Sequence, residues 1–371
     1  MHNLLYRLIA LEWSGLLIAA VVGLIGLWLR NVPFIVAALL LGIGNLAHLV
    51  LLARARTRFP PRGRLIDIGG YRVHLLAEGE ARDKHPVVWF GGGHGAGASM
   101  DHLHRILASE TRSILIDRPG TGWSDTGPFP RTTAREADEI ARALNAAGEV
   151  GPFVFAGHSF GGLLVANIAR RYPKMVACLV LLDATPLETI VFGPRLGAIR
   201  QMRNASLATA LLRWCGIHIN IGRWLQRRNP QFSEAAKVFE DQLGDALAHA
   251  RGRDASAGGP LAEHSIYREL VGPYVAACGW ETVVYDGDLG AMPVWLVAPG
   301  TAAEVLENSD VSAAGETESK RMVNFFARSR ERYMGVSSNS RRVVAPAGTT
   351  HQFVYERPDF VVTTIRDAIA L

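Results

Sequence analysis

A short turn flanked by glycines constrains the fold of this chain more than any other feature. The turn is Gly157-His-Ser-Phe-Gly161; it follows the β-branched and aromatic run 152–156 and precedes the helix-like run 163–170. Such a tight strand-to-helix turn needs glycine two residues before and after its centre, because side chains there would collide with backbone. The Ser159 hydroxyl is then raised above the sheet, beside the amide groups and partial positive charge of the helix start. The pattern predicts covalent catalysis by Ser159, and a purely structural glycine-rich turn is the weaker interpretation.

A nucleophilic serine requires a general base, and one histidine late in the chain is placed to supply it. His351 follows the strand-like run 342–346 and precedes the amphipathic pattern 358–370, which has proline in its first turn. This position, in a loop between a strand and a closing helix, predicts that His351 is the base. The less well placed histidines lie inside the serine turn or in an early helix-like segment: His158, His102 and His104.

Further landmarks surround the serine turn in a fixed order. They are the apolar run 87–90 with the glycine-rich loop 91–97, the segment Ile116-Asp-Arg-Pro-Gly-Thr-Gly-Trp-Ser124, and the apolar run 179–182 that ends at Asp183. Together with the serine turn and His351, these segments resemble the α/β-hydrolase superfamily over roughly residues 64–371. The resemblance implies a mostly parallel sheet of eight strands with helices on both faces.

The alternation of short apolar runs with helix-like stretches favours an α/β fold independently of that resemblance. The apolar runs are 87–90, 113–117, 152–156, 179–183, 293–298 and 342–346. Thr133 and Glu136 form a capping-box pattern at the start of one helix, and Gly148 suits its end. We therefore expect strands and helices to alternate through the core.

The carboxylate that completes a triad is open between several residues. The commonest pattern of the superfamily places an acid after the next-to-last strand, here 293–298, but no aspartate occupies that place. Asp183 is the preferred acid, because it ends the strand after the serine turn and resembles the acid of the pancreatic-type lipases. Glu304 is the alternative, one residue late, and Asp288 and Asp310 are weaker ones. Either carboxylate length can hold the base in the required tautomer.

The oxyanion that forms during acyl transfer needs two backbone donors. We expect one from Phe160, directly after the nucleophile, and the other from Gly93 or His94 in the glycine-rich loop. A phosphate cradle is disfavoured, because no Gly-Lys-Ser/Thr follows these glycines. The three cysteines, Cys178, Cys215 and Cys278, lack metal-ligand spacing, so neither a metal nor an organic cofactor is expected.

Two long apolar runs precede the predicted core. Leu8–Leu29 and Phe34–Leu52 are each long enough to cross a hydrocarbon layer of about 30 Å as a helix. Arg30-Asn-Val-Pro33 between them suits a tight turn, which favours a membrane hairpin of two spans. A cleaved signal peptide is the alternative for the first run, but a second apolar run follows at once.

The charge next to these runs predicts an orientation. Five arginines follow the second run: Arg54, Arg56, Arg58, Arg62 and Arg64. The turn contributes only Arg30 and the N-terminus Arg7, so the positive-inside rule places the termini and the catalytic domain in the cytoplasm. These arginines account for the net charge of +5 and suit anionic head groups, so nucleic acid is not expected as a partner.

The predicted architecture has four segments. They are a transmembrane hairpin with a basic linker, 1–58, the first part of the hydrolase core, 59–184, a helical cap, 185–290, and the second part of the core, 291–371. The prediction is a membrane-anchored serine hydrolase that acts on a small hydrophobic acyl substrate. Its neighbours in reaction type, thioester and small-peptide hydrolysis, stay open. Epoxide and haloalkane hydrolysis are disfavoured, because those branches of the superfamily use an aspartate nucleophile. A catalytically silent scaffold and a transporter component are the alternatives from other classes.

Overall fold

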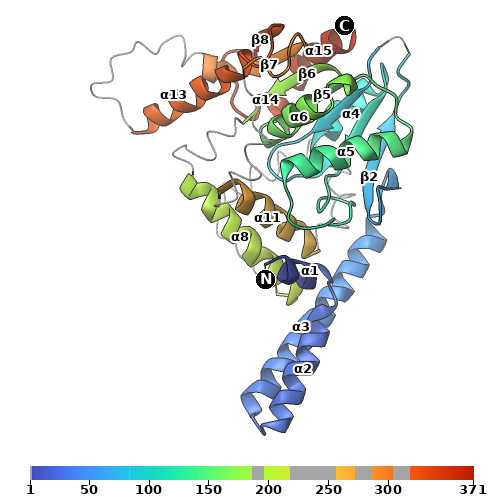
Figure 1. Cartoon of the computed structure of the whole chain (residues 1–371), viewed down its shortest axis with the longest axis vertical. Helices are drawn as coiled ribbons and strands as arrows, with labels where there is room; N and C mark the ends of the chain where they lie inside the picture. The colour runs from blue at the N-terminus through green and yellow to red at the C-terminus, as the bar shows by residue number, and fades with distance from the viewer. Residues whose placement is uncertain (1, 83, 186–195, 218–255, 272–285, 304–317) are drawn as a thin grey trace.

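The computed structural model describes residues 2–82, 84–185, 196–217, 256–271, 286–303 and 318–371. The alternative acids Glu304 and Asp310 and much of the predicted cap lie outside these residues, as does Cys278. The described part of the chain forms a wide body from which a helical hairpin projects (Figure 1).

An eight-stranded sheet forms the centre of the body. The strands are β1 Arg64–Asp67, β2 Arg72–Glu78, β3 Val87–Phe90, β4 Ser113–Ile116, β5 Phe153–His158, β6 Val176–Leu182, β7 Val294–Ala298 and β8 Ser340–Val344. Their order is β1-β2-β4-β3-β5-β6-β7-β8, with antiparallel pairing of β2 to β1 and β4 and parallel pairing elsewhere. The central strands are buried along their whole length because helices cover both faces. This confirms the predicted fold class.

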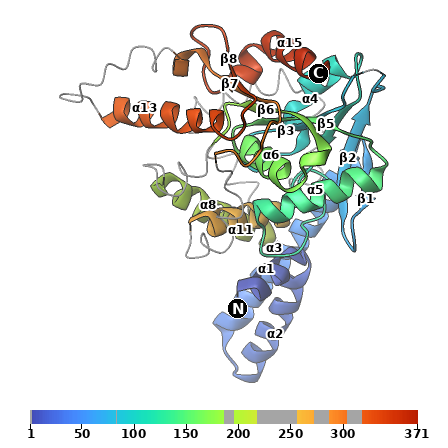
Figure 2. The same ribbon diagram turned by 45° about the horizontal axis from the view of Figure 1, so that its top comes forward.

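Helices cover both faces of the sheet (Figure 2). They are α4 Asp101–Leu107, α5 Thr133–Ala147, α6 Phe160–Arg171, α14 Phe353–Glu356 and α15 Pro358–Ile369, with short 3-10 turns η1 Gly97–Met100, η2 Pro173–Met175 and η5 Arg332–Met334. One buried cluster joins α5 and α6 to the sheet, and a second joins α4 and α15 to its other face. These two apolar layers hold the carboxyl ends of the parallel strands in place, which is where ligands bind in such sheets.

The start of α5 differs from the predicted capping box. Thr132, not Thr133, caps the helix, because its hydroxyl accepts the Arg135 N–H at 3.1 Å. The Glu136 side chain is fully buried in contacts with charged groups, so it does not close a box over the helix start. Gly148 ends the helix in the left-handed region, as predicted.

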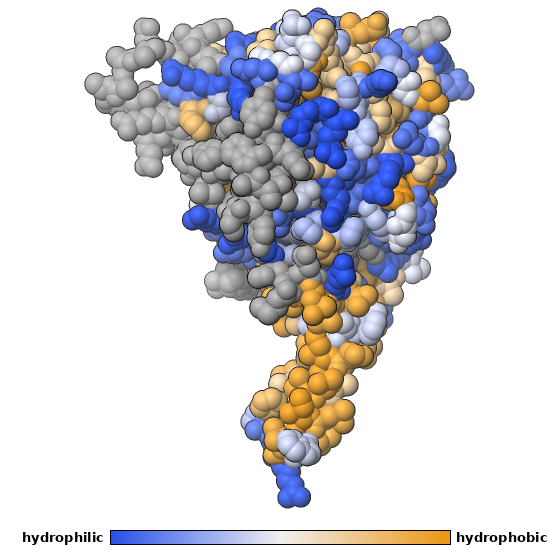
Figure 3. Space-filling view, viewed as in Figure 1, coloured by the Kyte–Doolittle hydropathy of each residue, from blue (hydrophilic) through white to orange (hydrophobic). Residues whose placement is uncertain are grey.

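Three helices precede the core: α1 His2–Ala10, α2 Ser14–Trp28 and α3 Val32–Arg58. α3 is long and apolar enough to cross a membrane, whereas α1 and α2 meet at an angle of 106°. The predicted first span, Leu8–Leu29, is therefore not one straight helix. α2 and α3 pack side by side, and their outward apolar side chains cover the projecting hairpin (Figure 3).

Two described helices lie between β6 and β7, where the cap was predicted. They are α8 Leu196–Trp214 and α11 Gly258–Val271, and they pack against each other. A further helix, α13 Glu318–Glu331, lies between β7 and β8.

Candidate active site

The predicted serine turn has the geometry of a nucleophile elbow. Ser159 sits between the end of β5 and the start of α6, with φ 54° and ψ −120°. This strained conformation is rare for a residue with a side chain and is the one that raises a nucleophile above its sheet. A Cβ atom on Gly157 would lie 2.5 Å from Gly161 O, and one on Gly161 would lie 2.5 Å from Phe90 O. Only glycine therefore fits at both flanking positions.

The structure brings His351 and Asp183 into direct contact. His351 lies in the loop between β8 and α14, and its Nδ1–H donates to Asp183 Oδ2 at 2.5 Å. The carboxylate is buried at the end of β6, whereas the imidazole is 37% exposed. With Nδ1 bonded to the carboxylate, Nε2 is the nitrogen that can exchange a proton.

Backbone contacts connect Ser159 to the segment that carries the acid. Ser159 N–H donates to Leu182 O at 3.1 Å, and Thr185 N–H donates to Ser159 O at 3.0 Å. The serine hydroxyl also lies 3.4 Å from Thr185 Oγ1. These contacts place Ser159 next to Leu182 and Thr185, which lie on either side of Asp183 in the chain.

His158 joins the elbow to the loop of His351. Its Nε2–H donates to the His351 carbonyl oxygen at 2.8 Å, and the two imidazole rings lie 4.7 Å apart. Burial, and the nearby His351, lower the pKa of His158 to about 4. His158 is thus a neutral, buried residue beneath the elbow, as the sequence indicated.

Arg330 is a contact of the acid that the sequence analysis missed. Its Nε lies 2.6 Å from Asp183 Oδ1, the oxygen that does not bind His351. The arginine comes from the last turn of α13, within a basic helical stretch that carries no motif. Each oxygen of Asp183 therefore contacts a different side chain, and together these contacts fix the rotation of the carboxylate.

The predicted oxyanion loop lies next to the elbow. A Cβ atom on Gly92 would come within 3.1 Å of Ser159 Cβ. Gly93 has φ 57°, and its carbonyl accepts a short hydrogen bond from Arg118 Nη2. The His94 side chain points elsewhere, because its Nε2 lies 3.3 Å from the buried Glu136 carboxylate. Only the backbone of His94 is thus available to a substrate.

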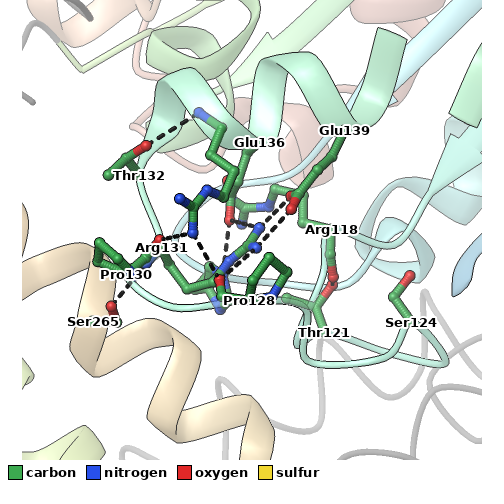
Figure 4. A network of polar contacts seen from close by, with 12 residues as sticks. Arg118, Thr121, Ser124, Pro128, Pro130, Arg131, Thr132, Glu136, Glu139 and Ser265 are labelled. Carbon is green, nitrogen blue, oxygen red and sulfur yellow. Dashed lines mark hydrogen bonds and ion pairs between the residues drawn. The ribbon is translucent and has the colours of Figure 1, made fainter. Parts of the chain in front are cut away.

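Figure 4 shows a buried ionic network, one arginine of which, Arg118, binds the Gly93 carbonyl of this loop. Arg118 lies 3.7 Å from Glu136, while Arg131 lies 3.6 Å from Glu136 and binds Glu139 through both nitrogens. These four side chains are almost fully buried, and burial lowers the pKa of Arg118. Buried charges persist only when paired, so each member depends on the others. The sequence signal for the network was the Asp-Arg-Pro-Gly segment, whose arginine had no assigned role.

Arg118 touches both elements that were predicted to supply oxyanion donors. It binds the Gly93 carbonyl, and its guanidinium lies 5.5 Å from the centre of the Phe160 ring. The network also reaches α11, because Arg131 N–H donates to the Ser265 hydroxyl at 2.9 Å. The same network therefore contacts the glycine-rich loop, the nucleophile elbow and helix α11 of the cap region.

Within the described ranges, no group of three histidine, cysteine or acidic residues could hold a metal ion. The described thiols, Cys178 and Cys215, are both free. Cys178 is buried in β6, and burial raises its pKa to about 12, which makes it an unreactive core residue.

The sequence profile of the alpha/beta hydrolase family matches residues 87–364. The chain belongs to this family. It is also similar to the (lyso)-N-acylphosphatidylethanolamine lipase of Bos taurus, at 27% identity over 198 residues, 48% of this chain and 55% of that protein. A vacuolar membrane protein of Saccharomyces cerevisiae is 28% identical over 141 residues, 33% of this chain and 21% of that protein.

Solved structures show the same fold. The crystal structure of Cfl2 from Burkholderia cenocepacia aligns with a TM-score of 0.56 at 23% identity, covering 84% of this chain and 98% of that one. The chain spans less than two thirds of the length of the first curated relatives that it matches, from 16% to 60%.

Proposed function

We propose that this α/β hydrolase is a membrane-anchored serine hydrolase that cleaves an ester or related acyl bond through Ser159, His351 and Asp183. The observation that carries the proposal is the 2.5 Å bond between His351 Nδ1 and Asp183 Oδ2, beside a serine in elbow geometry. His351, 168 residues after Asp183 in the chain, joins two consecutive strand ends in this arrangement, which a structural turn alone does not require. Glu304 lies outside the described residues, and the contact with His351 supports Asp183 as the acid.

In the proposed reaction, His351 Nε2 takes the proton from the Ser159 hydroxyl as its oxygen attacks the carbonyl carbon. The carbonyl electron pair moves onto the oxygen, which the Phe160 N–H and the N–H of Gly93 or His94 stabilise. When the intermediate collapses, the leaving group departs with the proton from His351. A water molecule, deprotonated by the same nitrogen, then attacks the acyl carbon. The bond to the Ser159 oxygen breaks, His351 returns the proton to that oxygen, and the acid is released.

The apolar α3 helix supports a membrane anchor, and the anchor supports a hydrophobic acyl substrate. Similarity to a lipase points the same way at the level of substrate class. We propose the catalytic domain on the cytoplasmic side, because Arg54, Arg56 and Arg58 end α3 next to the core. A fluorescent protein fused after Leu371 tests this orientation in a bacterial host, and we expect it to be fluorescent. Activity of alkaline phosphatase fused at the same place would contradict it.

A chain-length series of acyl esters tests the enzyme function. Full-length protein in detergent micelles should hydrolyse some members, and Ser159→Ala should reduce turnover at least about 1,000-fold. Ser109→Ala is the matched control, because this exposed serine bonds only the Ile106 carbonyl, at 2.8 Å, among the contacts described. Equal turnover by the Ser159 and Ser109 variants would refute the proposed nucleophile. No turnover of any ester or thioester by the unchanged protein would favour the silent scaffold.

A further inference from the structure

Two polar residues of the apolar N-terminal runs, Glu12 and Asn45, bind the cap region. Glu12, between α1 and α2, accepts the N–H groups of Ala257 at 3.1 Å and Gly258 at 3.3 Å, where α11 begins. The helix start favours a negative charge, since its first amide groups have no partner within the helix. His48 of α3 binds the same carboxylate at 2.6 Å. One carboxylate therefore joins α1, α3 and α11.

Asn45 forms a second joint, deeper along α3. Its amide nitrogen donates to Glu12 O at 2.9 Å and to Trp214 O, at the end of α8, at 2.8 Å. Next to it, a Cβ atom on Gly44 would overlap the Cys215 carbonyl oxygen, so the backbones of α3 and the α8 end touch. Small residues permit the same close approach between helices inside membranes.

α1 completes the contact with the cap region. The Tyr6 hydroxyl lies 2.7 Å from His264 Nδ1 of α11. Tyr6 and Ile9 are buried in one apolar cluster with Phe129 and with residues of α8 and α11. Figure 1 shows α1 lying between the hairpin and these two helices. The hairpin, α1, α8 and α11 are thus packed as one body.

The positions of Gly44 and Asn45 along α3 determine how deep the cap region lies relative to the apolar part of that helix. The apolar part of α3 runs from Val32 to Leu52, about 20 residues, which is about 30 Å and matches a hydrocarbon layer. Gly44 precedes Arg54, the first charged residue of α3, by about 10 residues, or ~15 Å. Leu46 and Val50, between them, still expose their side chains. The end of α8 therefore touches α3 about halfway through the apolar layer.

Besides Arg7, the exposed side chains that the structure describes in α1, in the turn after it and in the α8 end at 211–217 are apolar. They are Leu4, Leu5, Leu11 and Trp13 around α1, and Leu211 and Ile217 at the end of α8. α1 lies at 106° to α2, so it would run along the membrane plane when α2 crosses it. Its single arginine, Arg7, has a long side chain that can reach the head groups from there. We call these six exposed apolar residues the cap edge.

We propose that the cap edge is a lipid-docking surface that sits among the acyl chains of the leaflet next to the catalytic domain. This inference rests on the membrane anchoring of the proposed function and goes beyond it, because it assigns lipid contact to the cap region and not to the hairpin alone. An apolar substrate would meet the cap without first leaving the leaflet. Glu12 and Asn45 hold the edge at that depth.

Photolabelling in a bilayer tests the proposal. Full-length protein is placed in nanodiscs of phosphatidylcholine and phosphatidylglycerol that contain a lipid with a photoreactive diazirine on its acyl chain, and adducts are mapped by mass spectrometry. We expect adducts on α2 and α3 and also on the peptides that carry Leu4–Trp13 and Leu211–Ile217. Val150 is the internal control: its side chain is 78% exposed and apolar, but it belongs to the core and should stay unlabelled.

Adducts confined to α2 and α3 would overturn the proposal while leaving the anchor intact. Adducts on neither the hairpin nor the cap edge would overturn the anchoring itself, which separates the two failures. Glu12→Ala should lower the yield on the 211–217 peptide at least about threefold, because the α11 start loses its carboxylate. Glu12→Gln keeps an oxygen that can accept from Ala257 and should stay near the unchanged protein. Unaltered yield in Glu12→Ala would contradict the role of Glu12.

Discussion

At the residue scale, the candidate site depends on one carboxylate held by two partners. Asp183 Oδ2 binds His351 and Oδ1 lies 2.6 Å from Arg330. Asp183 itself has φ 47°, an uncommon conformation at the end of a buried strand. The sequence left the acid open between Asp183 and Glu304, because no aspartate follows the next-to-last strand at the usual place and Glu304 comes one residue late. The contact of Asp183 with His351 supports Asp183, while Glu304 lies outside the described residues.

Substitution of Asp183 should weaken His351 as a general base but leave the protein folded. Asp183→Asn leaves an amide of nearly the same shape but favours the wrong imidazole tautomer, so kcat should fall on the order of 10⁴-fold. Glu304→Gln should leave kcat within about twofold. Steady-state kinetics on one ester measures both. Loss of turnover in the glutamate variant alone would assign the acid to Glu304.

Arg118 should act on turnover through the loop that it holds. Arg118→Met removes the donor to the Gly93 carbonyl and a charge partner of Glu136, so kcat should fall about 100-fold and stability by about 3 kcal/mol. Adding Glu136→Gln should recover stability, because the buried charge is removed, but not kcat. Denaturant unfolding and initial rates separate the two effects. If the double variant regained kcat together with stability, Arg118 would have only a structural role.

His158 should make stability depend on pH. Its pKa is about 4 in the folded protein and about 6.5 when unfolded, so the unfolded state binds the extra proton between these values. Stability is therefore complete above about pH 6.5 and is lost as the pH falls towards 4, by at most about 1.4 kcal/mol per pH unit. His158→Gln should flatten this decline in urea unfolding. Burial also lowers the pKa of His94, His102 and His104, so some slope should remain. An unchanged slope would contradict the assignment.

At the element scale, the sequence predicted what local patterns decide. The serine turn, β5 and α6 follow from glycine spacing and apolar runs, because the strain at Ser159 is imposed by its immediate neighbours. The predicted capping box does not form: Thr132 caps the helix, and Glu136 instead joins the buried network, which is a tertiary contact. The predicted single helix 8–29 bends at Glu12, whose carboxylate binds the start of α11 more than two hundred residues later.

The elbow should tolerate no side chain at its flanking glycines. Gly161→Ala would place a Cβ atom 2.5 Å from the Phe90 carbonyl oxygen, so we expect a loss of stability of about 1–3 kcal/mol and a matching loss of activity. Gly197→Ala is the matched control, because no atom of the described residues lies within 4 Å of its added methyl group. It should be neutral or slightly stabilising. Equal melting temperatures of the two variants would argue against the close packing of the elbow.

At the scale of the whole molecule, an alpha/beta hydrolase core packs through its cap region against a helical hairpin. The core was predictable because five landmarks occur in a fixed order along the chain. The packing of the hairpin against the cap region could not be predicted. Glu12, Asn45 and His48 are isolated polar residues in apolar runs, and no sequence motif marks the partners Ala257 and Trp214. The contact of Arg330 with Asp183 could not be predicted either, because no motif distinguishes this arginine from the others of α13.

The most direct test of the central claim is to identify the residue that reacts with a fluorophosphonate. The probe should add one phosphonyl group to the full-length protein, and peptide mapping should place it on Ser159. His351→Ala should slow the labelling, because the hydroxyl then has no base. An adduct on any other residue, or no adduct on a protein that is folded, would contradict the account.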